Sequence, residues 1–452
     1  MCLQTVLFDK PKSVVGFRDS AFTKNRDLPL HRWVPWIAGF SAQFVDDCLE
    51  KYISRRRNGS SWVLDPFAGV GTTLLQGYLH GFNVVGFEIN PYAALASKVK
   101  LQASSVSIGE FERHIAAYER FMHGNCPDYG QREGEPLSKP PDGFQGRTQL
   151  FSPRVERRVL TSLDFIGRIG APLIADLFRI ALGSVMVSVS NYSYEPSLTR
   201  RAAVDKPEIE DAPVAAVLSS KLRLMLEDVG WLRRRMSEVG GVPQRIVVPG
   251  SFFSAREALR KSAFADLVIT SPPYLNNYHY PRNTRPQLHW LGFASGPGYK
   301  GAREDESFGK FWQTVRQLPP VPLCFSFPAL EKVIERVRGL NTEKGSYGGP
   351  GWANYAATYF NDTYRFCQLL NRMLRPNSVA VIVLGNSIIQ GVEVKTDHFF
   401  GTISELCGLT FEDNFMIRKK RTGNSIIQSS VRVDKAAYKA TLYESAIVLR
   451  KK

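Results

Sequence analysis

Short apolar runs rich in β-branched residues recur along the chain, bounded by Gly, Pro, Asn or Asp, and such runs predict buried strands. Seven follow from this pattern: 62–64, 82–88, 245–248, 265–270, 378–384, 411–417 and 444–449. Stretches with helical periodicity lie before and between these strands. Two of them end near residues 52 and 80, and three others cover 92–100, 355–374 and about 396–407. Strands that alternate with helices predict a doubly wound, Rossmann-like α/β fold: a seven-stranded, mostly parallel sheet with a C-terminal antiparallel hairpin.

Two stretches interrupt this alternation. Over 104–240, four helical segments (108–122, 155–169, 172–189 and 214–236) are separated by polar loops, which predicts a largely helical insertion. Over 285–354, Pro and Gly are frequent, which predicts an irregular insertion. The remaining segments, 1–103, 241–284 and 355–452, are expected to form the core. A chain of 452 residues exceeds one typical domain, as such insertions require.

Charge and composition narrow the class of protein. The chain carries 58 Lys and Arg against 42 Asp and Glu, a net charge of +16 that suits a polyanionic partner such as nucleic acid. Its six cysteines form no CxxC pair, which argues against a zinc site and a disulfide framework. The most apolar long stretch, 173–189, is interrupted by Asp176 and Arg179 and predicts a buried helix, not a membrane span. We therefore expect a cytoplasmic protein that neither binds a membrane nor contains a metal ion.

A glycine-containing loop joins the first predicted strand to its helix. The stretch 65–73 reads Asp-Pro-Phe-Ala-Gly-Val-Gly-Thr-Thr, and Gly69 and Gly71 allow a tight turn and close approach to a ligand. Glu88 ends the next strand, where a carboxylate can accept hydrogen bonds from ribose hydroxyls. No lysine follows Gly71, which disfavours an ATP-type loop, and Leu74 breaks a full GxGxxG. The candidate cofactor-binding residues are Asp65, Pro66, Phe67, Gly69, Gly71, Thr72, Thr73 and Glu88.

A cofactor with a ribose and no phosphates fits these residues best, and S-adenosyl-L-methionine is the common one. The alternative is a structural glycine turn with a surface glutamate.

A second loop, Ser271-Pro272-Pro273-Tyr274, follows the strand 265–270. Two prolines end that strand and fix a rigid turn at its C-terminal end, where open α/β sheets bind ligands. The hydroxyl, a proline carbonyl and the aromatic ring can accept hydrogen bonds from an amino group and stack on the flat ring that carries it. The alternative is an ordinary Pro-Pro loop with a packing tyrosine.

Together, the stretches 65–73 and 270–274 resemble the cofactor and catalytic motifs of the amino-group DNA methyltransferases of Ser-Pro-Pro-Tyr type, which act on cytosine N4 or adenine N6. The stretch 30–41 is similar to the segment that covers the methionine moiety. The stretch 379–391, with Leu384-Gly385-Asn386-Ser387, resembles the late core strand. The resemblance implies S-adenosyl-L-methionine as cofactor, 1–103 as the cofactor-binding half of the core and 241–284 as the half with the catalytic motif. The sequence departs from the family pattern after the third strand, where it has Gly250-Ser251 and the family often has an acidic residue.

The resemblance also implies a mechanism. Ser271 and the Pro272 carbonyl would accept the two N–H bonds of an exocyclic amine and localise its lone pair, while Tyr274 stacks on the base. Such a base must be flipped out of double-stranded DNA, at a cost of a few kcal/mol. A serine at the head of the motif favours cytosine N4. Adenine-N6 methylation of DNA or RNA remains an alternative, as does a non-catalytic nucleic-acid-binding module, and the presence of a cognate restriction endonuclease is left open.

Basic residues outside these motifs are candidates for DNA contact. Arg418, Lys419, Lys420 and Arg421 lie in the loop between the last two strands, where they could bind phosphates. Arg200 and Arg201, after an aromatic stretch at 191–194, are similar candidates. The alternative for each group is a solvated run of charge. Because the resemblance leaves no separate C-terminal region, target recognition is expected in an internal insertion, with 285–354 as the candidate.

Overall fold

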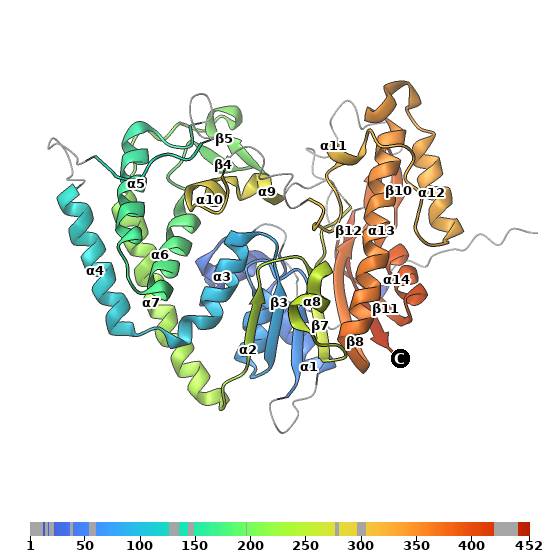
Figure 1. Ribbon diagram of the computed structural model, residues 1–452, viewed down its shortest axis with the longest axis horizontal. Helices are drawn as coiled ribbons and strands as arrows, with labels where there is room; N and C mark the ends of the chain where they lie inside the picture. Colours follow the sequence, from blue (N-terminus) through green and yellow to red (C-terminus); the bar gives the residue numbers. More distant parts are fainter. Residues whose placement is uncertain are drawn as a thin grey trace, which may run out of the picture.

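The computed structural model describes residues 12–13, 17, 22–36, 39–53, 60–125, 135–142, 149–195, 197–275, 280–295, 304–419 and 442–452. At its centre is one sheet with the strand order β1-β11-β12-β8-β7-β2-β3-β6 (Figure 1). Five neighbouring strands are parallel: β6 (Arg245–Val248), β3 (Asn83–Phe87), β2 (Trp62–Asp65), β7 (Ala265–Thr270) and β8 (Leu374–Gly385). Next to β8 lie the antiparallel strands β12 (Tyr443–Lys451) and β11 (Leu409–Lys419), and the short β1 (Lys12–Ser13) pairs with β11.

Seven of these strands are the seven that the hydrophobic pattern predicts, so the predicted Rossmann-like fold with its C-terminal antiparallel pair is confirmed. The eighth, β1, was not predicted, because two residues carry no periodicity. The direction of the strand order reverses between β2 and β7: β3 and β6 follow β2 on one side, and β8 follows β7 on the other. Open α/β sheets bind their ligands beyond the C-terminal ends of the strands at such a reversal.

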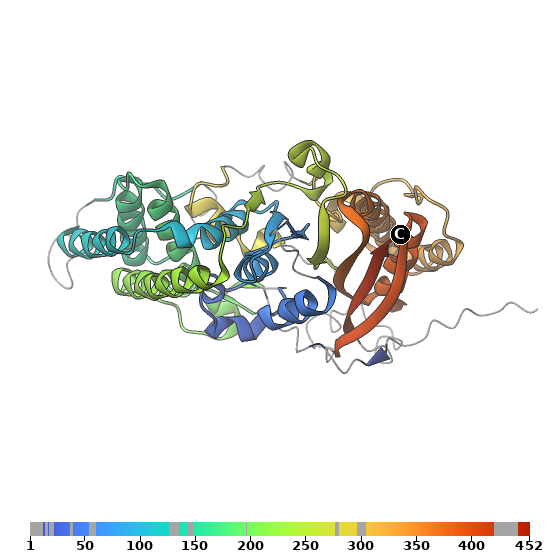
Figure 2. The same cartoon turned by 90° about the horizontal axis from the view of Figure 1, so that it is seen from below.

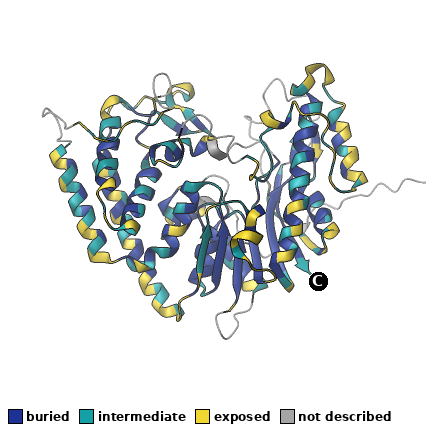
Figure 3. Cartoon of the chain, in the orientation of Figure 1, coloured by how far each residue is buried: buried dark blue, intermediate teal, exposed yellow. Residues whose placement is uncertain are grey.

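Side chains alternate along the central strands, which gives the sheet a separate hydrophobic core on each face. In β2, Val63 packs into one core and Leu64 into the other. The first core includes α1 (Ala42–Tyr52), α2 (Thr72–Leu79) and α3 (Pro91–Gln102); the second includes α13 (Gly349–Met373) and α14 (Thr396–Leu406). The strands are therefore buried between helices on both sides (Figure 3).

The ends of α2 and α3 follow from local sequence signals. Gly81, at φ +81°, ends the turn after α2. Asn90 caps α3, because its Oδ1 accepts hydrogen bonds from the backbone N–H groups of Tyr92 and Ala93 at 3.1 and 3.3 Å. Pro91 begins α3, where a missing N–H costs nothing. The predicted bounds of both helices are therefore within two residues of the observed ones.

Residues 104–240 form a group of helices at one end of the molecule (Figure 2). They are α4 (Ile108–Asn125), α5 (Pro153–Gly167), α6 (Pro172–Val185) and α7 (Val214–Val239). All four helical segments that the pattern predicts are present, with ends that differ by up to four residues. The short antiparallel pair β4 (Tyr192–Tyr194) and β5 (Leu198–Arg200) was not predicted. The predicted domain boundaries stay predictions.

The stretch 285–354 contains more regular structure than predicted. Its described part contains the α-helices α10 (Arg285–Trp290), α11 (Trp312–Val315) and α12 (Pro328–Arg338). Outside this stretch, α8 (Ala255–Leu259) and α9 (Tyr280–Asn283) precede it, and the antiparallel pair β9 (Ser387–Ile389) and β10 (Val392–Val394) follows β8. The α13 helix begins at Gly349, six residues before the predicted start. Its Pro350 stands in the first turn, where proline is compatible with a helix.

Candidate active site

The two predicted motifs meet where the strand order reverses, at the ends of β2 and β7. Thr270, the last residue of β7, donates a hydrogen bond from Oγ1 to Oδ1 of the buried Asp65 at 2.6 Å. Thr73, in the first turn of α2, donates from Oγ1 to the carbonyl oxygen of Ile269 at 3.2 Å. Two segments about 200 residues apart in sequence are thus joined directly. Ser271 consequently begins its turn beside the 65–73 loop.

Gly69 and Gly71 give the 65–73 loop its shape. Their φ angles are +51° and +85°, a region that side-chain-bearing residues rarely adopt. A Cβ on Gly71 would lie 2.8 Å from Oγ and 3.2 Å from Cα of Ser97, and a Cβ on Gly69 would lie 3.2 Å from Nε1 of Trp36. Ser97 also donates from Oγ to the Gly69 carbonyl at 2.8 Å. The loop therefore passes so close to its neighbours that only glycine fits.

A Gly71→Ala variant is expected to lose roughly 2–4 kcal/mol of unfolding free energy, because it combines a strained φ with a clash against the backbone of Ser97. Urea denaturation measures this loss. Gly109→Ala is the matched control, since a Cβ there meets no atom within 4 Å and alanine is the better helix former. Equal stability of the two variants would contradict the expectation.

Glu88 follows β3 and contacts the glycine loop. Its Oε2 accepts a hydrogen bond from the backbone N–H of Gly69 at 2.7 Å, and its Oε1 accepts one from Asn90 at 2.7 Å. A carboxylate has about four acceptor sites, so capacity for a further hydrogen bond remains. Desolvation raises the pKa of Glu88 to about 7, against the opposing effect of hydrogen bonds from the backbone N–H groups of Asn90, Gly69 and Ile89. Burial likewise raises the pKa of Asp65 to about 6. Two carboxyl groups that titrate near neutral pH thus flank the loop.

The Ser271-Pro272-Pro273-Tyr274 turn is held from α13. Tyr359, which is buried, donates from its hydroxyl to the carbonyl oxygen of Pro273 at 3.0 Å. Within the described residues, Oγ of Ser271 and the carbonyl oxygen of Pro272 have no hydrogen-bond partner. Ser271 and Tyr274 are partly exposed. The turn is therefore fixed by one of its carbonyl groups while two acceptors remain available.

Aromatic rings connect the glycine loop to the support of this turn. Phe67 packs on Phe308 and Phe366 at centroid distances of 5.4 and 5.5 Å, and Phe308 packs edge-on against Tyr359 at 5.2 Å. Pro66 and Thr72 are buried in the same loop. The predicted cofactor-binding residues are thus brought together with Tyr359, which sequence reasoning missed.

Ser251 stands where the family often has an acidic residue, and its side chain forms hydrogen bonds with backbone groups. Its Oγ donates to the carbonyl oxygen of Glu306 at 2.5 Å and accepts from the backbone N–H of Phe253 at 3.2 Å. The departure from the family pattern therefore has a local structural role in the turn after β6.

Arg200 and Arg201 differ in their surroundings. The β4–β5 pair is attached to the segment that follows the Ser271–Tyr274 turn, because Tyr194 donates to the carbonyl oxygen of Asn283 at 3.0 Å and Asn283 Oδ1 accepts from the N–H of Leu198 at 2.8 Å. Arg200 is exposed at the end of this pair. Arg201 donates from Nε to the carbonyl oxygen of Pro207 at 2.7 Å and so supports its own loop. Arg200 is the better placed of the two for a phosphate.

The predicted basic cluster is only partly described. Arg418 forms an ion pair across the β11–β12 pair, with 2.8 Å between its Nη2 and Oε2 of Glu444. Lys419 is exposed at the end of β11. Lys420 and Arg421 lie outside the described residues. Arg418 therefore has a structural partner, and Lys419 carries the more accessible charge.

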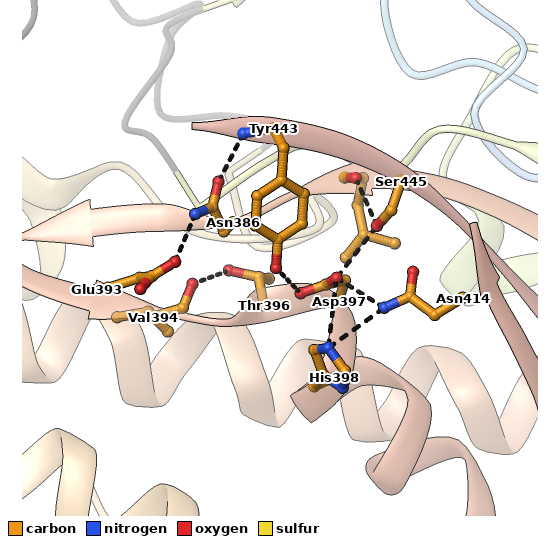
Figure 4. A network of polar contacts seen from close by, with 10 residues as sticks. Asn386, Glu393, Val394, Thr396, Asp397, His398, Asn414, Tyr443 and Ser445 are labelled. Atoms are coloured by element: carbon orange, nitrogen blue, oxygen red, sulfur yellow. Dashed lines mark hydrogen bonds and ion pairs between the residues drawn. The ribbon is translucent and has the colours of Figure 1, made fainter. Parts of the chain in front are cut away.

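A buried polar network lies at the start of β12 (Figure 4). The carboxylate of Asp397 is fully buried and accepts hydrogen bonds from Tyr443 Oη at 3.0 Å, Asn414 Nδ2 at 2.8 Å and Ser445 Oγ at 3.2 Å. Asn386, from the stretch that resembles the late core strand, accepts from the backbone N–H of Tyr443 at 2.9 Å. The network joins α14, the middle of β11, the start of β12 and the residue that follows β8, so these residues have a structural role.

The sequence of the chain is similar to those of several known methyltransferases. No protein-family model matches the chain. The chain is 23% identical to the Type II methyltransferase M.BsoBI of Geobacillus stearothermophilus, over 90% of this chain and 83% of that protein. It is 24% identical to the Type II methyltransferase M.AvaI of Nostoc sp., over 90% and 84%, and 28% identical to the Type II methyltransferase M.MvaI of Kocuria varians, over 51% and 50%. The chain is thus similar to these Type II methyltransferases, to two of them over most of its length.

This relationship confirms the methyltransferase resemblance that the two motifs carry, whereas the Ser-Pro-Pro-Tyr class stays a prediction. With the Rossmann-like sheet, it implies S-adenosyl-L-methionine as the methyl donor. The residues fit that molecule, because the partly exposed Glu88 carboxylate has acceptor capacity beyond the backbone N–H groups that it binds. Among solved structures, the rRNA methyltransferase aviRa from Streptomyces viridochromogenes aligns with 95% of this chain and 92% of its own, at 10% identity and with a TM-score of 0.32.

No helix in the described part of the chain is long and apolar enough to cross a membrane. Among the same residues, no group of three or more His, Cys, Asp or Glu side chains is placed to hold a metal ion.

Proposed function

We propose that the chain is an S-adenosylmethionine-dependent DNA methyltransferase that modifies cytosine N4 in a specific sequence of double-stranded DNA. The observation that carries the proposal is the hydrogen bond between Thr270 and Asp65, which puts the catalytic turn beside the cofactor loop. The Type II methyltransferase relatives and the net charge of +16 support it. A cytoplasmic location agrees with this assignment, which leaves the presence of a cognate restriction endonuclease open.

The chemistry depends on the residues of the turn. An exocyclic amine conjugated to a heteroaromatic ring is a poor nucleophile, because its lone pair is delocalised. Oγ of Ser271 and the Pro272 carbonyl oxygen accept its two N–H groups and localise that lone pair on the nitrogen. Tyr274 stacks on the flipped base. The amine nitrogen would form its N–CH3 bond as the S–CH3 bond of the bound sulfonium breaks; the thioether would leave and the nitrogen would release one proton to water. Holding both reactants in line supplies a large part of the rate.

The test is methyl transfer from isotopically labelled S-adenosylmethionine to double-stranded DNA, followed by digestion and mass analysis of the nucleosides. N4-methylcytosine is the expected product. If the product is N6-methyladenine, the chain is a DNA methyltransferase but its target base is adenine. If only added RNA becomes labelled, the substrate is RNA and not DNA. Binding of DNA without any transferred label would favour a non-catalytic nucleic-acid-binding module. Long-read sequencing of DNA from cells that express the chain would then give the target sequence.

The Tyr359→Phe variant is expected to lower kcat for methyl transfer about two- to tenfold, because the catalytic turn loses the hydrogen bond to the Pro273 carbonyl, worth about 0.5–1.5 kcal/mol. The Kd for S-adenosylmethionine should stay unchanged. Tyr118→Phe is the matched control: its hydroxyl is also buried and hydrogen-bonded, to Ser162 Oγ at 2.9 Å, but lies among the helices of 104–240. An equal kcat in the two variants would refute a positioning role for Tyr359.

A further inference from the structure

A buried carboxylate of α7 binds a segment that is about 200 residues away in sequence. Oδ2 of Asp228 accepts hydrogen bonds from the backbone N–H of Leu30 at 2.9 Å and from Nε1 of Trp33 at 2.9 Å. Arg32 forms a bidentate pair with the same carboxylate, with Nη2–Oδ1 at 2.6 Å and Nε–Oδ2 at 3.1 Å. Only 2% of Asp228 is exposed. Because such charge-assisted bonds are strong when water is excluded, Asp228 anchors residues 30–33 to α7.

The same face of α7 holds this segment at its other end. Residues His31–Trp33 form one helical turn, with Asp228 at its N-terminal end. Lys221, two turns before Asp228 on α7, donates from Nζ to the carbonyl oxygen of Arg32 at 2.7 Å. The signs of the two charges suit the two ends of the turn. Leu30 has a φ of +61°, a conformation that persists only when its surroundings fix it.

On its opposite side, the anchored segment contacts the cofactor loop. The indole Nε1 of Trp36 lies 3.2 Å from the position that a Cβ on Gly69 would occupy. Nε2 of His31 is hydrogen-bonded to Oε1 of Gln76, in α2, at 3.0 Å. Residues 30–36 are therefore held between α7 and the elements that carry Gly69. A shift of this segment would move Trp36 away from the loop.

We propose that Asp228 is a positioning residue for the cofactor site: through it, α7 holds residues 30–36 so that Trp36 covers the glycine loop. The identity of the ligand rests on the proposed function. The proposal gives Asp228 of α7 a supporting role at the cofactor site, which no motif in the helical stretch 104–240 indicates. It also means that a ligand which displaces α7 would change the affinity for the cofactor.

The first test compares the Kd for S-adenosylmethionine, by titration calorimetry, in the wild type and two variants. Asp228→Ala should raise the Kd about tenfold or more, and Asp228→Asn, which keeps one acceptor oxygen, should raise it less. The KM for S-adenosylmethionine should rise in parallel, while kcat at saturating cofactor stays within about twofold of the wild type. Glu119→Ala is the matched control, because it removes another ion pair of α7, with Arg223 at 2.8 Å, and should leave the Kd unchanged. A wild-type Kd in Asp228→Ala, or equal weakening in Glu119→Ala, would overturn the proposal.

The second test needs no ligand. Hydrogen exchange should become faster at residues 30–36 in Asp228→Ala, because the Leu30 amide loses its acceptor, and should stay unchanged there in Glu119→Ala. Unchanged exchange at 30–36 in Asp228→Ala would show that the anchor does not exist. A wild type that binds no S-adenosylmethionine while this exchange difference persists would overturn the proposed function and the cofactor part of the proposal, but not the anchor.

Discussion

Replacing Ser271 by alanine is expected to lower kcat for methyl transfer by about 10²–10³-fold, the usual effect of removing one hydrogen-bonding group that stabilises a transition state. In the proposed mechanism, the variant keeps the Pro272 carbonyl as the only acceptor for the amine. The Kd for S-adenosylmethionine should change less than about twofold, since Ser271 is not among the proposed cofactor residues. Ser271 forms no hydrogen bond within the described residues, so the fold should tolerate the change.

Single-turnover methyl transfer at saturating cofactor and DNA measures this effect without a contribution from product release. Ser237→Ala is the matched control, because Ser237 is an exposed serine of α7 whose hydroxyl only donates to the carbonyl oxygen of Arg234 at 2.7 Å. Full activity in Ser271→Ala would remove the role given to this hydroxyl. A large rise in the Kd for S-adenosylmethionine would instead place Ser271 in the cofactor site.

The strands could be predicted from the sequence because each is a compact run of apolar residues between turn residues. The end of β7 and the turn after β2 also follow from local chemistry: Pro272 and Pro273 cannot continue the ladder beyond Thr270, and Gly71 has a φ that only glycine adopts readily. The early start of α13 could not be predicted from its Gly-Pro-Gly sequence, because 349–351 indicates a turn unless the following helix is known to extend over it. There, tertiary packing decides.

The contacts that position the candidate site were not predictable. Tyr359 lies 86 residues after Pro273 on a long helix, and nothing in its own sequence separates it from a core tyrosine. Asp228 sits in a helix with many charged neighbours and reads as solvated, yet its carboxylate is buried against residues 30–33. Arg418 reads as a phosphate ligand, but the register of β11 and β12 places it against Glu444. Each of these pairings depends on how distant elements meet, which no short pattern records.

Affinity for S-adenosylmethionine is expected to fall below about pH 7, by up to tenfold per pH unit, and to be flat above it. Desolvation raises the pKa of Glu88 to about 7, so the group is protonated below that pH and loses an acceptor that the ribose hydroxyls need. Asp65, whose pKa burial raises to about 6, adds to the effect only at lower pH. Titration calorimetry between pH 5.5 and about pH 8.5 covers both groups.

The raised pKa of Glu88 also makes the stability of the cofactor-free protein depend on pH, and this dependence is opposite to that of the affinity. The pKa of Glu88 is raised above its ordinary value of 4.5, so the stability that this group contributes is fully present below pH 4.5 and is lost as the pH rises through 7. The cofactor-free protein should therefore lose stability, and the cofactor should bind more tightly, across one pH window. Urea denaturation with and without S-adenosylmethionine separates the two trends.

The variant that tests this assignment is Glu88→Gln, which keeps the shape of the side chain and removes its titration. Its amide group can satisfy Gly69 or Asn90 but not both with an oxygen, and it cannot offer charge-assisted bonds to both ribose hydroxyls. At about 1.5 kcal/mol for each of two such bonds, the Kd at pH 8 should rise about 10²-fold. The dependence of the Kd on pH between 6 and 8 should disappear, whereas Glu119→Gln should keep both the affinity and the slope of the wild type. A wild-type slope in Glu88→Gln would mean that another group titrates in this window, with Lys100, whose pKa burial lowers to about 7, as the nearest candidate on α3.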